Sequence, residues 1–307
     1  MSLIWLIGNF GSIINCFIFS QRSLRKNPCV MYLLASSVAQ FLTFNFALLT
    51  RILYMGYNIQ IVNTLLWYCK FRYYFFYISV AIPRYYIILA SVDRYFVSSS
   101  DIYWRRWSSS KIAMRLIICS FLFWCLMYIQ VLVFYEIQDD NCSFRNGVYA
   151  IFFSVYLLIE SGIFPPLMML IFGFLTVNNI RKSKRTTRPL SAANVIGYGH
   201  FTGMSRKDLQ FSKMLLNQIC LWIILNILNP CYLLYQTITI NDTQSSLRLA
   251  VESFISNMTY FFIYLEFSLT FFVYTLSSSL FRREFNQLLQ KNILRRFSSN
   301  ITVTNNT

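Results

Sequence analysis

Seven long apolar stretches set this sequence apart from that of a soluble protein. A helix needs about 20 mostly apolar residues to cross the hydrocarbon core of a membrane, and each stretch is long enough. The stretches are Met1–Ser20, Cys29–Ile52, Phe71–Val92, Ile112–Phe134, Val148–Val177, Met214–Tyr235 and Met258–Leu280. Lipid offers no partners to backbone polar groups, so each stretch should be helical, whereas a barrel would show alternating strands of about 10 residues. The sequence therefore predicts an all-α membrane protein with a seven-transmembrane helix bundle.

The composition excludes two other classes of protein. Apolar residues make up 56% of the chain and charged residues 12%, against roughly 25% charged residues in soluble domains. A soluble domain could not bury 30 Phe and 21 Tyr residues, and a disordered chain would be poor in them. The net charge of +16 would suit a nucleic-acid partner, but the basic residues lie in short segments between the apolar stretches, so we expect no such partner. The first stretch lacks the basic start and cleavage site of a signal peptide, and we interpret it as a span.

The distribution of Lys and Arg predicts the orientation of the chain, because cytoplasmic loops are enriched in these residues. Nineteen of them fall on one side: Arg22, Arg25, Lys26, Arg105, Arg106, Lys111, Arg181, Lys182, Lys184, Arg185, Arg188, Arg206, Lys207, Lys213, Arg282, Arg283, Lys291, Arg295 and Arg296. Five fall on the other side: Arg51, Lys70, Arg72, Arg145 and Arg248. We therefore expect a multi-pass plasma-membrane protein with its N-terminus outside and its C-terminus in the cytoplasm.

The loops predicted to lie outside are acidic and carry glycosylation motifs. Their acidic residues are Glu136, Asp139, Asp140, Asp242 and Glu252. Asn-x-Ser/Thr motifs begin at Asn141, Asn241 and Asn257, of which the last is too near the predicted bilayer to be modified. We expect glycans at Asn141 and Asn241.

The third stretch ends in Asp93-Arg94-Tyr95. Here the chain resembles the rhodopsin-like (class A) G-protein-coupled receptors, whose third helix ends in the same three residue types. The family places a disulfide cysteine 25 residues before that arginine, where Cys69 stands, and its partner in the second outer loop, where Cys142 is the only cysteine. The resemblance therefore implies a Cys69–Cys142 disulfide, as an oxidising compartment would favour.

Other landmarks extend the resemblance over nearly the whole chain. They are Gly8-Asn9 in the first stretch, Trp124 in the fourth, Pro166 or Pro165 in the fifth, Pro230 in the sixth and Tyr274 in the last. After them, Phe281, Phe285, Leu288 and Leu289 share one face of a short segment whose other face is basic, which predicts an amphipathic helix on the inner membrane surface. We divide the chain into a receptor domain, 1–280, and an amphipathic helix with a cytoplasmic tail, 281–307.

Several positions depart from the family pattern. Gln40 stands where the family has a sodium-binding aspartate, and the sixth stretch reads Ile227-Leu228-Asn229-Pro230, without the family's tryptophan. The last stretch reads Thr270-Phe271-Phe272-Val273-Tyr274 and keeps only the tyrosine. Asn9 follows only eight residues, so we expect that an outer N-terminal segment is missing. The chain resembles a divergent receptor whose switching details differ from those of the family.

The resemblance implies roles for Asp93, Arg94, Tyr95, Pro230 and Tyr274 in switching and G-protein coupling. Asp93 would hold Arg94 in the inactive state, and Arg94 would meet the G protein when the sixth span swings outward. The alternative is an interfacial charge pair that only snorkels to the membrane surface.

Three ionisable residues, Arg84, Glu160 and Glu266, are predicted to lie at membrane depth together with the polar Asn9 and Gln40. An unpaired charge there costs roughly 2.5–3.5 kcal/mol, so we expect all three to face the bundle interior. We hypothesise an Arg84–Glu160 or an Arg84–Glu266 ion pair, which would serve either as structural glue or as part of a switch.

The ligand is predicted from the outer ends of the spans. Amine receptors carry an aspartate eighteen residues before the arginine, and Phe76 stands there instead. Acidic loop residues, including Asp139 and Asp140, would lie above an aromatic mouth that includes Tyr73 and Tyr77, which suits a cationic peptide. The pattern resembles that of invertebrate neuropeptide receptors, including the FMRFamide-like ones. Alternatively, these aromatic residues form an ordinary interfacial belt.

The cytoplasmic partners implied by the resemblance are a heterotrimeric G protein and arrestin, while the basic inner segments can also face anionic membrane lipids. An enzyme is not expected: the chain has one histidine, His200, no Cys/His metal cluster and no phosphate-binding glycine loop. We expect no cofactor and no metal. A membrane transporter, or a degenerate seven-helix protein that no longer signals, stays open as an alternative.

Overall fold

A computed structural model describes residues 1–57, 59, 61–138, 141–145, 147–186, 205–239 and 245–290. The chain order is α1 (Ser2–Phe19), α2 (Pro28–Leu42), η1 (Thr43–Leu48), α3 (Leu49–Tyr57), α4 (Ile61–Thr64), α5 (Leu66–Ser98), α6 (Ile102–Arg106), α7 (Ser110–Met127), α8 (Ile129–Phe134), β1 (Tyr135–Gln138), β2 (Asn141–Phe144), α9 (Val148–Leu157), η2 (Leu158–Ile163), α10 (Phe164–Thr186), α11 (Arg206–Asn226), α12 (Leu228–Ile238) and α13 (Ser246–Ser277). A further helix follows at 279–290. The elements η1 and η2 are single turns of π-helix.

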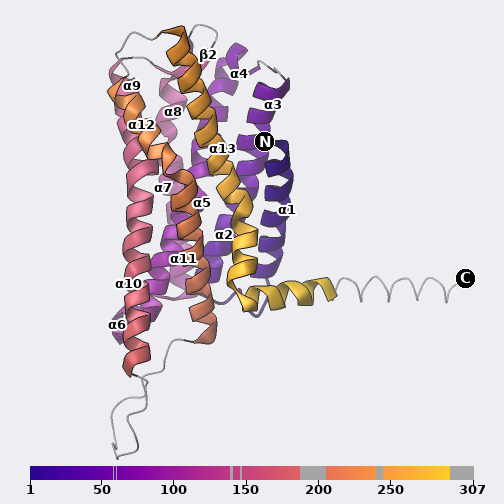
Figure 1. Cartoon of the computed structure of the whole chain (residues 1–307), viewed down its shortest axis with the longest axis vertical. Coiled ribbons are helices and arrows are strands. Elements are labelled where there is room, and N and C mark those ends of the chain that lie inside the picture. Colours follow the sequence, from indigo (N-terminus) through magenta and orange to yellow (C-terminus); the bar gives the residue numbers. More distant parts are fainter. Residues whose placement is uncertain are drawn as a thin grey trace, which may run out of the picture.

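The long helices run side by side as one bundle (Figure 1). Among the described residues, six helical segments are long and apolar enough to cross a membrane: Ser2–Phe19, Pro28–Tyr57, Leu66–Ser98, Ser110–Phe134, Val148–Lys182 and Ser246–Ser277. A seventh span arises if the pair Arg206–Asn226 and Leu228–Gln236, which is bent by 40°, is taken as one. The architecture is that of an all-α membrane protein, as the apolar stretches predict.

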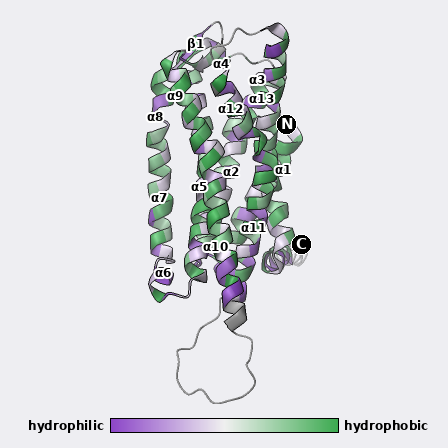
Figure 2. Cartoon of the chain, turned by 60° about the vertical axis from the view of Figure 1, so that its left-hand side comes forward, coloured by the Kyte–Doolittle hydropathy of each residue, from purple (hydrophilic) through white to green (hydrophobic). Residues whose placement is uncertain are grey.

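Apolar residues predominate along the long helices (Figure 2), and many of their side chains are exposed on the outside of the bundle. The helix pair α7–α8 shows this most clearly, because Ile118, Leu122 and Leu126 are more than half exposed. An exposed apolar surface of this extent would aggregate in water. Such a surface requires an apolar environment, which the hydrocarbon core of a membrane provides.

Side-chain caps begin several of the helices. The Asn27 carboxamide accepts a hydrogen bond from the Cys29 backbone N–H and precedes Pro28, which occupies the first helical position of α2. Asp101, Ser109, Ser205 and Ser245 cap α6, α7, α11 and α13 in the same way. These residues satisfy N–H groups that a helix start leaves unpaired. They explain why the helices extend beyond the apolar stretches.

Prolines and π-turns interrupt three of the spans. The π-turn η2 lies directly before Pro165-Pro166, which supply no backbone N–H, and the break between α11 and α12 lies three residues before Pro230. A missing N–H and a widened turn both change the direction in which neighbouring side chains point. This local change decides where Glu160 and Ser161 face.

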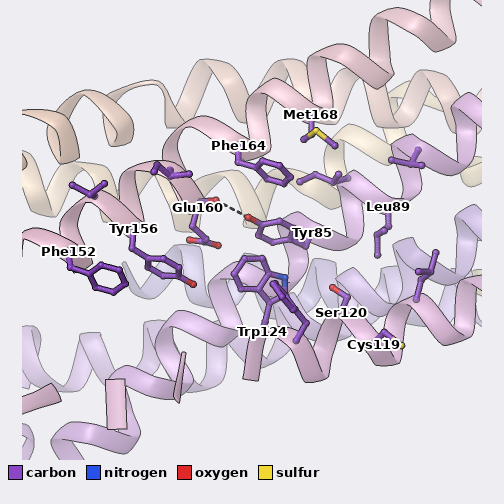
Figure 3. A pocket seen from close by; sticks show the side chains of 16 residues that line it. Tyr85, Leu89, Cys119, Ser120, Trp124, Phe152, Tyr156, Glu160, Phe164 and Met168 are labelled. Carbon is purple, nitrogen blue, oxygen red and sulfur yellow. Dashed lines mark hydrogen bonds between the residues drawn. The ribbon is translucent and has the colours of Figure 1, made fainter. Parts of the chain in front are cut away.

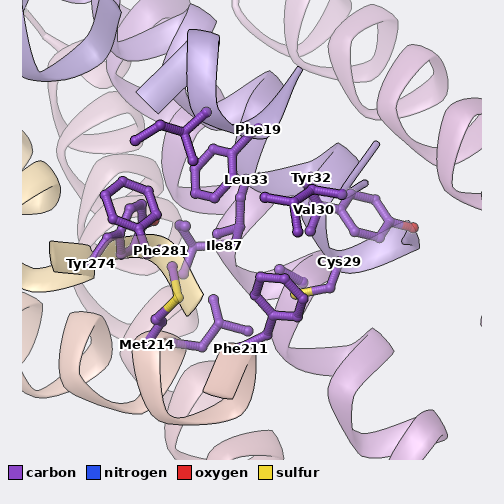
Figure 4. Packing of buried hydrophobic residues seen from close by; sticks show 14 of the residues in the cluster. Phe19, Cys29, Val30, Tyr32, Leu33, Ile87, Phe211, Met214, Tyr274 and Phe281 are labelled. Atoms are coloured by element: carbon purple, nitrogen blue, oxygen red, sulfur yellow. The ribbon is translucent and has the colours of Figure 1, made fainter. Parts of the chain in front are cut away.

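A large hydrophobic cluster closes one end of the bundle (Figure 4). Tyr274 is fully buried there, with its ring 5.7 Å from Phe19 and 6.0 Å from Phe281, centroid to centroid. Helix 279–290 leaves α13 at a steep angle beneath α1 (Figure 1) and is anchored by the buried Phe281. Phe285 and Leu288 are partly buried against the same cluster, and Leu289 is exposed. An amphipathic helix is thus present where the sequence predicts it.

A close approach between α1 and η1 leads to a first prediction. A Cβ atom at Gly8 would lie 2.3 Å from the tip of the Phe44 ring, which is fully buried and held between α5 and α13 residues. Gly8→Ala should therefore lower the free energy of unfolding by about 1–3 kcal/mol through overpacking. Thermal unfolding in detergent measures this.

Gly56 provides the matched control. A Cβ atom there would lie 4.0 Å from Ile52, an ordinary contact, and alanine favours a helix over glycine by roughly 0.5–1 kcal/mol. Gly56→Ala should leave the midpoint temperature of thermal unfolding unchanged or raise it slightly. Equal midpoints for the two variants would show that the α1–η1 contact is loose.

Candidate functional site

The guanidinium of Arg94 is the centre of a buried polar cluster at the same end of the bundle. Its Nη2 lies 2.5 Å from Asp93 Oδ2, and its Nη1 lies 2.6 Å from Asp208 Oδ1. Nη2 also donates to Asn27 Oδ1 at 3.2 Å. Arg94 is 1% exposed. One side chain of α5 thus connects the start of α11 with the start of α2.

The partners of Arg94 are themselves held in place. Asn27 donates from Nδ2 to Asp208 Oδ1 at 3.1 Å, and the Ser108 hydroxyl donates to Asp93 Oδ1 at 2.6 Å. The Ser205 hydroxyl donates to Asp208 Oδ2 at 2.7 Å. We call Asn27, Asp93, Arg94, Ser108 and Asp208 the Arg94 cluster. Its hydrogen bonds compensate the burial of Asp93 and Arg94 and the partial burial of Asp208, which would otherwise be strongly unfavourable.

Three members of the Arg94 cluster, Asn27, Ser108 and Asp208, are absent from the sequence-based prediction. Asp208 lies three residues after Ser205, a spacing typical of a helix start, and Asn27 precedes Pro28. These signals predict helix caps only. Tyr95, which the resemblance assigns to the same function, lies outside the cluster and packs on Phe172 of α10 with 5.7 Å between ring centroids.

Arg84, Glu160 and Glu266 are buried at mid-bundle, with exposures of 3%, 6% and 2%. The hypothesis of an ion pair between Arg84 and either glutamate is wrong for the described structure, in which no such pair lies within 4.0 Å. Arg84 Nη1 instead donates to the Ser161 hydroxyl at 2.6 Å. The reason is the π-turn η2, which directs Ser161 toward α5, while the Glu160 carboxyl points between Tyr156 and Trp124 (Figure 3).

Glu266 belongs to a separate hydrogen-bonded group. Gln218 Nε2 donates to Glu266 Oε1 at 2.5 Å and to the Thr270 hydroxyl at 3.2 Å. Gln40 Nε2 reaches the same hydroxyl at 3.5 Å. This group joins α2, α11 and α13. Gln40 therefore has a structural partner at the position where the family has an aspartate.

Asn9 and Pro230 hold neighbouring helices together. The Asn45 amide donates to Asn9 Oδ1 at 2.6 Å, which ties α1 to η1. Pro230 of α12 packs against Gly162 of η2 so closely that a Cβ atom on the glycine would lie 2.9 Å from Pro230 Cβ. Asn229, the preceding residue, donates to the Ser161 hydroxyl at 3.3 Å. The bend of the sixth span is thus in contact with the residue that binds Arg84.

At the opposite end of the bundle, a disulfide joins Cys69 of α5 to Cys142 of β2, with 5.8 Å between their Cα atoms. This is the pair that the resemblance implies. The strands β1 and β2 form an antiparallel hairpin, and Asn63 Oδ1 accepts a hydrogen bond from the Cys142 N–H at 3.1 Å. The hairpin is held against the start of α5.

Aromatic side chains lie beneath this hairpin. The hydroxyls of Tyr77 and Tyr135 are 2.7 Å apart, and the rings of Tyr73 and Tyr135 are 4.8 Å apart. Tyr135 is buried, whereas Trp67 is exposed. Tyr73 and Tyr77 therefore pack inside the bundle rather than in an interfacial belt, and Trp67 fits a belt. Asp139, Asp140 and Asn241 lie outside the described residues, and Asn141 is described only as part of β2.

A cavity of about 150 Å³ lies between the hairpin and the mid-bundle charges. Phe76, Tyr77 and Tyr260 line it together with Arg84, Glu160 and Asn229. Arg51 covers the ring of Tyr260 at 3.9 Å. In the described part of the chain the cavity thus combines aromatic faces with one cation and one carboxyl group, so it could hold a ligand that has both an aromatic and a polar part.

The described residues contain no group of three or more His, Cys, Asp or Glu side chains that could hold a metal ion. No known protein family model matches the chain, and none of the curated proteins matches it either.

Proposed function

We propose that this protein is a divergent G-protein-coupled receptor of the rhodopsin-like class. The Arg94 cluster carries the proposal. It places the arginine of the Asp93-Arg94-Tyr95 motif in contact with Asp208, at the start of the helix pair that would have to move. The Cys69–Cys142 disulfide and the cavity at the other end of the bundle support the same assignment.

In the proposed orientation, the Arg94 cluster faces the cytoplasm and the disulfide faces the outside of the plasma membrane. This follows from the excess of Lys and Arg on the Arg94 side. Glycans at Asn141 and Asn241 belong to the same proposal. The G protein and arrestin would bind at the Arg94 end.

Switching would be an equilibrium between two arrangements of the α11–α12 pair. In the closed arrangement Arg94 is held by Asp93 and Asp208. In the open arrangement the start of α11 moves away, and Arg94 becomes free to bind the G protein. A ligand can shift this equilibrium only as far as its affinities for the two arrangements differ. Asn229 and Pro230 belong to α12, and both contact η2, whose Glu160 and Ser161 line the cavity. A ligand in the cavity would therefore act on the α11–α12 pair through these contacts.

The proposed ligand is a cationic neuropeptide. Its aromatic side chain would enter the cavity near Phe76, Tyr77 and Tyr260. A basic group would meet the π-faces of these rings and the Glu160 carboxyl, where cation–π and charge interactions are favourable away from water. Acidic outer loops would raise the association rate.

Agonist-evoked GTP exchange tests the proposal. Membranes that contain the full chain and purified heterotrimeric G proteins are exposed to pools of amidated peptides, and GTP exchange is measured. At least one pool should raise exchange, and Arg94→Ala should abolish the response at equal surface expression. Arg105→Ala, which removes a cation of α6 on the same side, should keep it.

The buried Arg84, Glu160 and Glu266 also favour a second function, since charges at membrane depth can mark the path of a transported ion. Solute and proton uptake into proteoliposomes separates the two. Uptake without any peptide-evoked GTP exchange would support a transporter and contradict the receptor. A chain that shows neither activity would be a degenerate, non-signalling seven-helix protein.

A further inference from the structure

A second and larger hollow lies on the outside of the bundle, between α5, α7 and the segment α9–η2–α10 (Figure 3). Its volume is about 750 Å³, within the range of ligand pockets. Aromatic rings form much of its wall: Tyr85, Phe123, Trp124, Phe152, Tyr156 and Phe164. We call this hollow the lateral groove.

The lateral groove opens on the outside of the bundle, since Phe123, Phe152 and Ile159 of its wall are more than half exposed. A molecule that enters the groove must therefore come from the hydrocarbon phase. A peptide is a poor candidate, because its backbone polar groups would find too few partners there.

Glu160 is the charged residue in the wall of the groove. The Tyr128 hydroxyl is hydrogen-bonded to this carboxyl group, but the buried Oε1 has no hydrogen-bond partner within the described part of the chain. The Tyr85 hydroxyl, which is nearby, already donates to the Glu160 backbone carbonyl at 3.0 Å (Figure 3). A buried acceptor without a donor is costly, so a ligand that supplies a donor gains that free energy on binding.

The chemistry of the wall selects the head group of the ligand. No Lys or Arg lines the lateral groove over the residues described, so a phosphate or carboxylate head group would be buried beside Glu160 without a counter-charge. A hydroxyl group would donate to Oε1 at little desolvation cost. The flat aromatic faces of Trp124 and Phe164 match a rigid, flat apolar body better than a flexible chain.

We propose that the lateral groove is a sterol site in which the ligand's hydroxyl group donates to the Glu160 carboxyl and its fused rings pack on the aromatic wall. Glu160 also lines the central cavity, and its neighbour Ser161 binds Arg84. The bound sterol would thus lie one residue away from the Arg84 hydrogen bond. This assignment is independent of receptor activity.

A second lateral groove of about 520 Å³, between α2, η1, α5 and α7, provides an internal control. It is also mostly apolar, but its hydroxyl groups are satisfied. Tyr74, Ser79 and Tyr86 each donate to a backbone carbonyl. Both grooves are mostly apolar, and the carboxyl oxygen Oε1 of Glu160, which has no partner among the described residues, distinguishes the first from the second.

Photolabelling tests the site. The full chain in phosphatidylcholine nanodiscs is exposed to a photoreactive cholesterol analogue, and labelled peptides are identified by mass spectrometry. We expect labelling on α7, α9 or α10 that excess cholesterol lowers at least fivefold. Glu160→Leu, which removes the acceptor, and Cys119→Trp, which fills the groove, should each reduce it to a similar extent. Val38→Trp, at an exposed position of the control groove, should leave it unchanged.

A second experiment uses the wild-type chain, so its result does not depend on whether the variants fold. A cholesterol analogue whose hydroxyl is methylated cannot donate, and it should compete at least fivefold less well than cholesterol. Equal competition by the two sterols, better competition by monooleoylglycerol, or labelling mainly in the control groove would overturn the proposal. GTP exchange enters none of these measurements, so failure here leaves the proposed function untouched.

Discussion

Asp208→Asn should raise GTP exchange in the absence of ligand several-fold, up to about tenfold. The substitution removes the charge that holds Arg94 Nη1 at 2.6 Å in the closed arrangement, and it leaves the hydrogen bond from Asn27 possible. Breaking one partner of a buried ion pair costs about 3–5 kcal/mol. The Asp208 side chain is 18% exposed, which lowers that figure through solvent screening. Because about 1.4 kcal/mol corresponds to a factor of ten in an equilibrium constant, even a reduced cost changes the ratio of the open to the closed arrangement measurably.

The measurement is nucleotide exchange on purified G protein, normalised to the amount of each variant at the cell surface. Asp101→Asn is the matched control, since it makes the same chemical change on the same side of the bundle at an exposed cap of α6. Arg94→Ala, alone or combined with Asp208→Asn, should show no exchange above background. If Asp208→Asn left basal exchange unchanged while Arg94→Ala still signalled fully, the Arg94 cluster would be structural only.

Cys142→Ser should lower the free energy of unfolding by about 2–5 kcal/mol. The disulfide closes a loop of 73 residues, and its loss gives the unfolded chain many more conformations. The hairpin would then be held by aromatic packing on α5 and by neutral hydrogen bonds, such as that of Tyr135 with Tyr77 of α5 and that of the Cys142 N–H with Asn63 of α4. The cavity beneath the hairpin should open as well, so peptide-evoked exchange should fall together with stability.

Thermal unfolding followed by tryptophan fluorescence measures the change. Cys69→Ser should match Cys142→Ser, and the double variant should be no worse, because both single variants break the same bond. Cys220→Ser, which alters an exposed free cysteine, is the control. An unchanged midpoint for Cys142→Ser, or a non-reduced digest without a Cys69–Cys142 peptide, would contradict the prediction.

The sequence predicts where the helices are more reliably than where they end. Each apolar stretch corresponds to a helical segment, but α5 begins at Leu66 and ends at Ser98, beyond the predicted Phe71–Val92. Hydropathy marks the part of a helix that lipid covers, whereas hydrogen bonding and caps determine its full length. Similarly, Pro165-Pro166 indicate an irregularity, but not that a π-turn precedes them.

The candidate site was only partly predictable. Arg94 and Asp93 are adjacent, so a motif reveals them together. Asp208 and Asn27 lie 114 and 67 residues from Arg94 along the chain, and each is recognisable alone only as a helix cap. Arg84 shows the converse: its burial was predicted, but its partner was not, because the partner depends on the rotation of η2.

By itself, the sequence determined that this chain forms apolar helices suited to a membrane, since hydrocarbon accepts long apolar segments only with their backbone hydrogen bonds paired internally. The tertiary structure alone decided which polar groups meet inside the bundle. Those meetings depend on the order, rotation and bending of the helices, and a periodic pattern within one helix contains no information about the others.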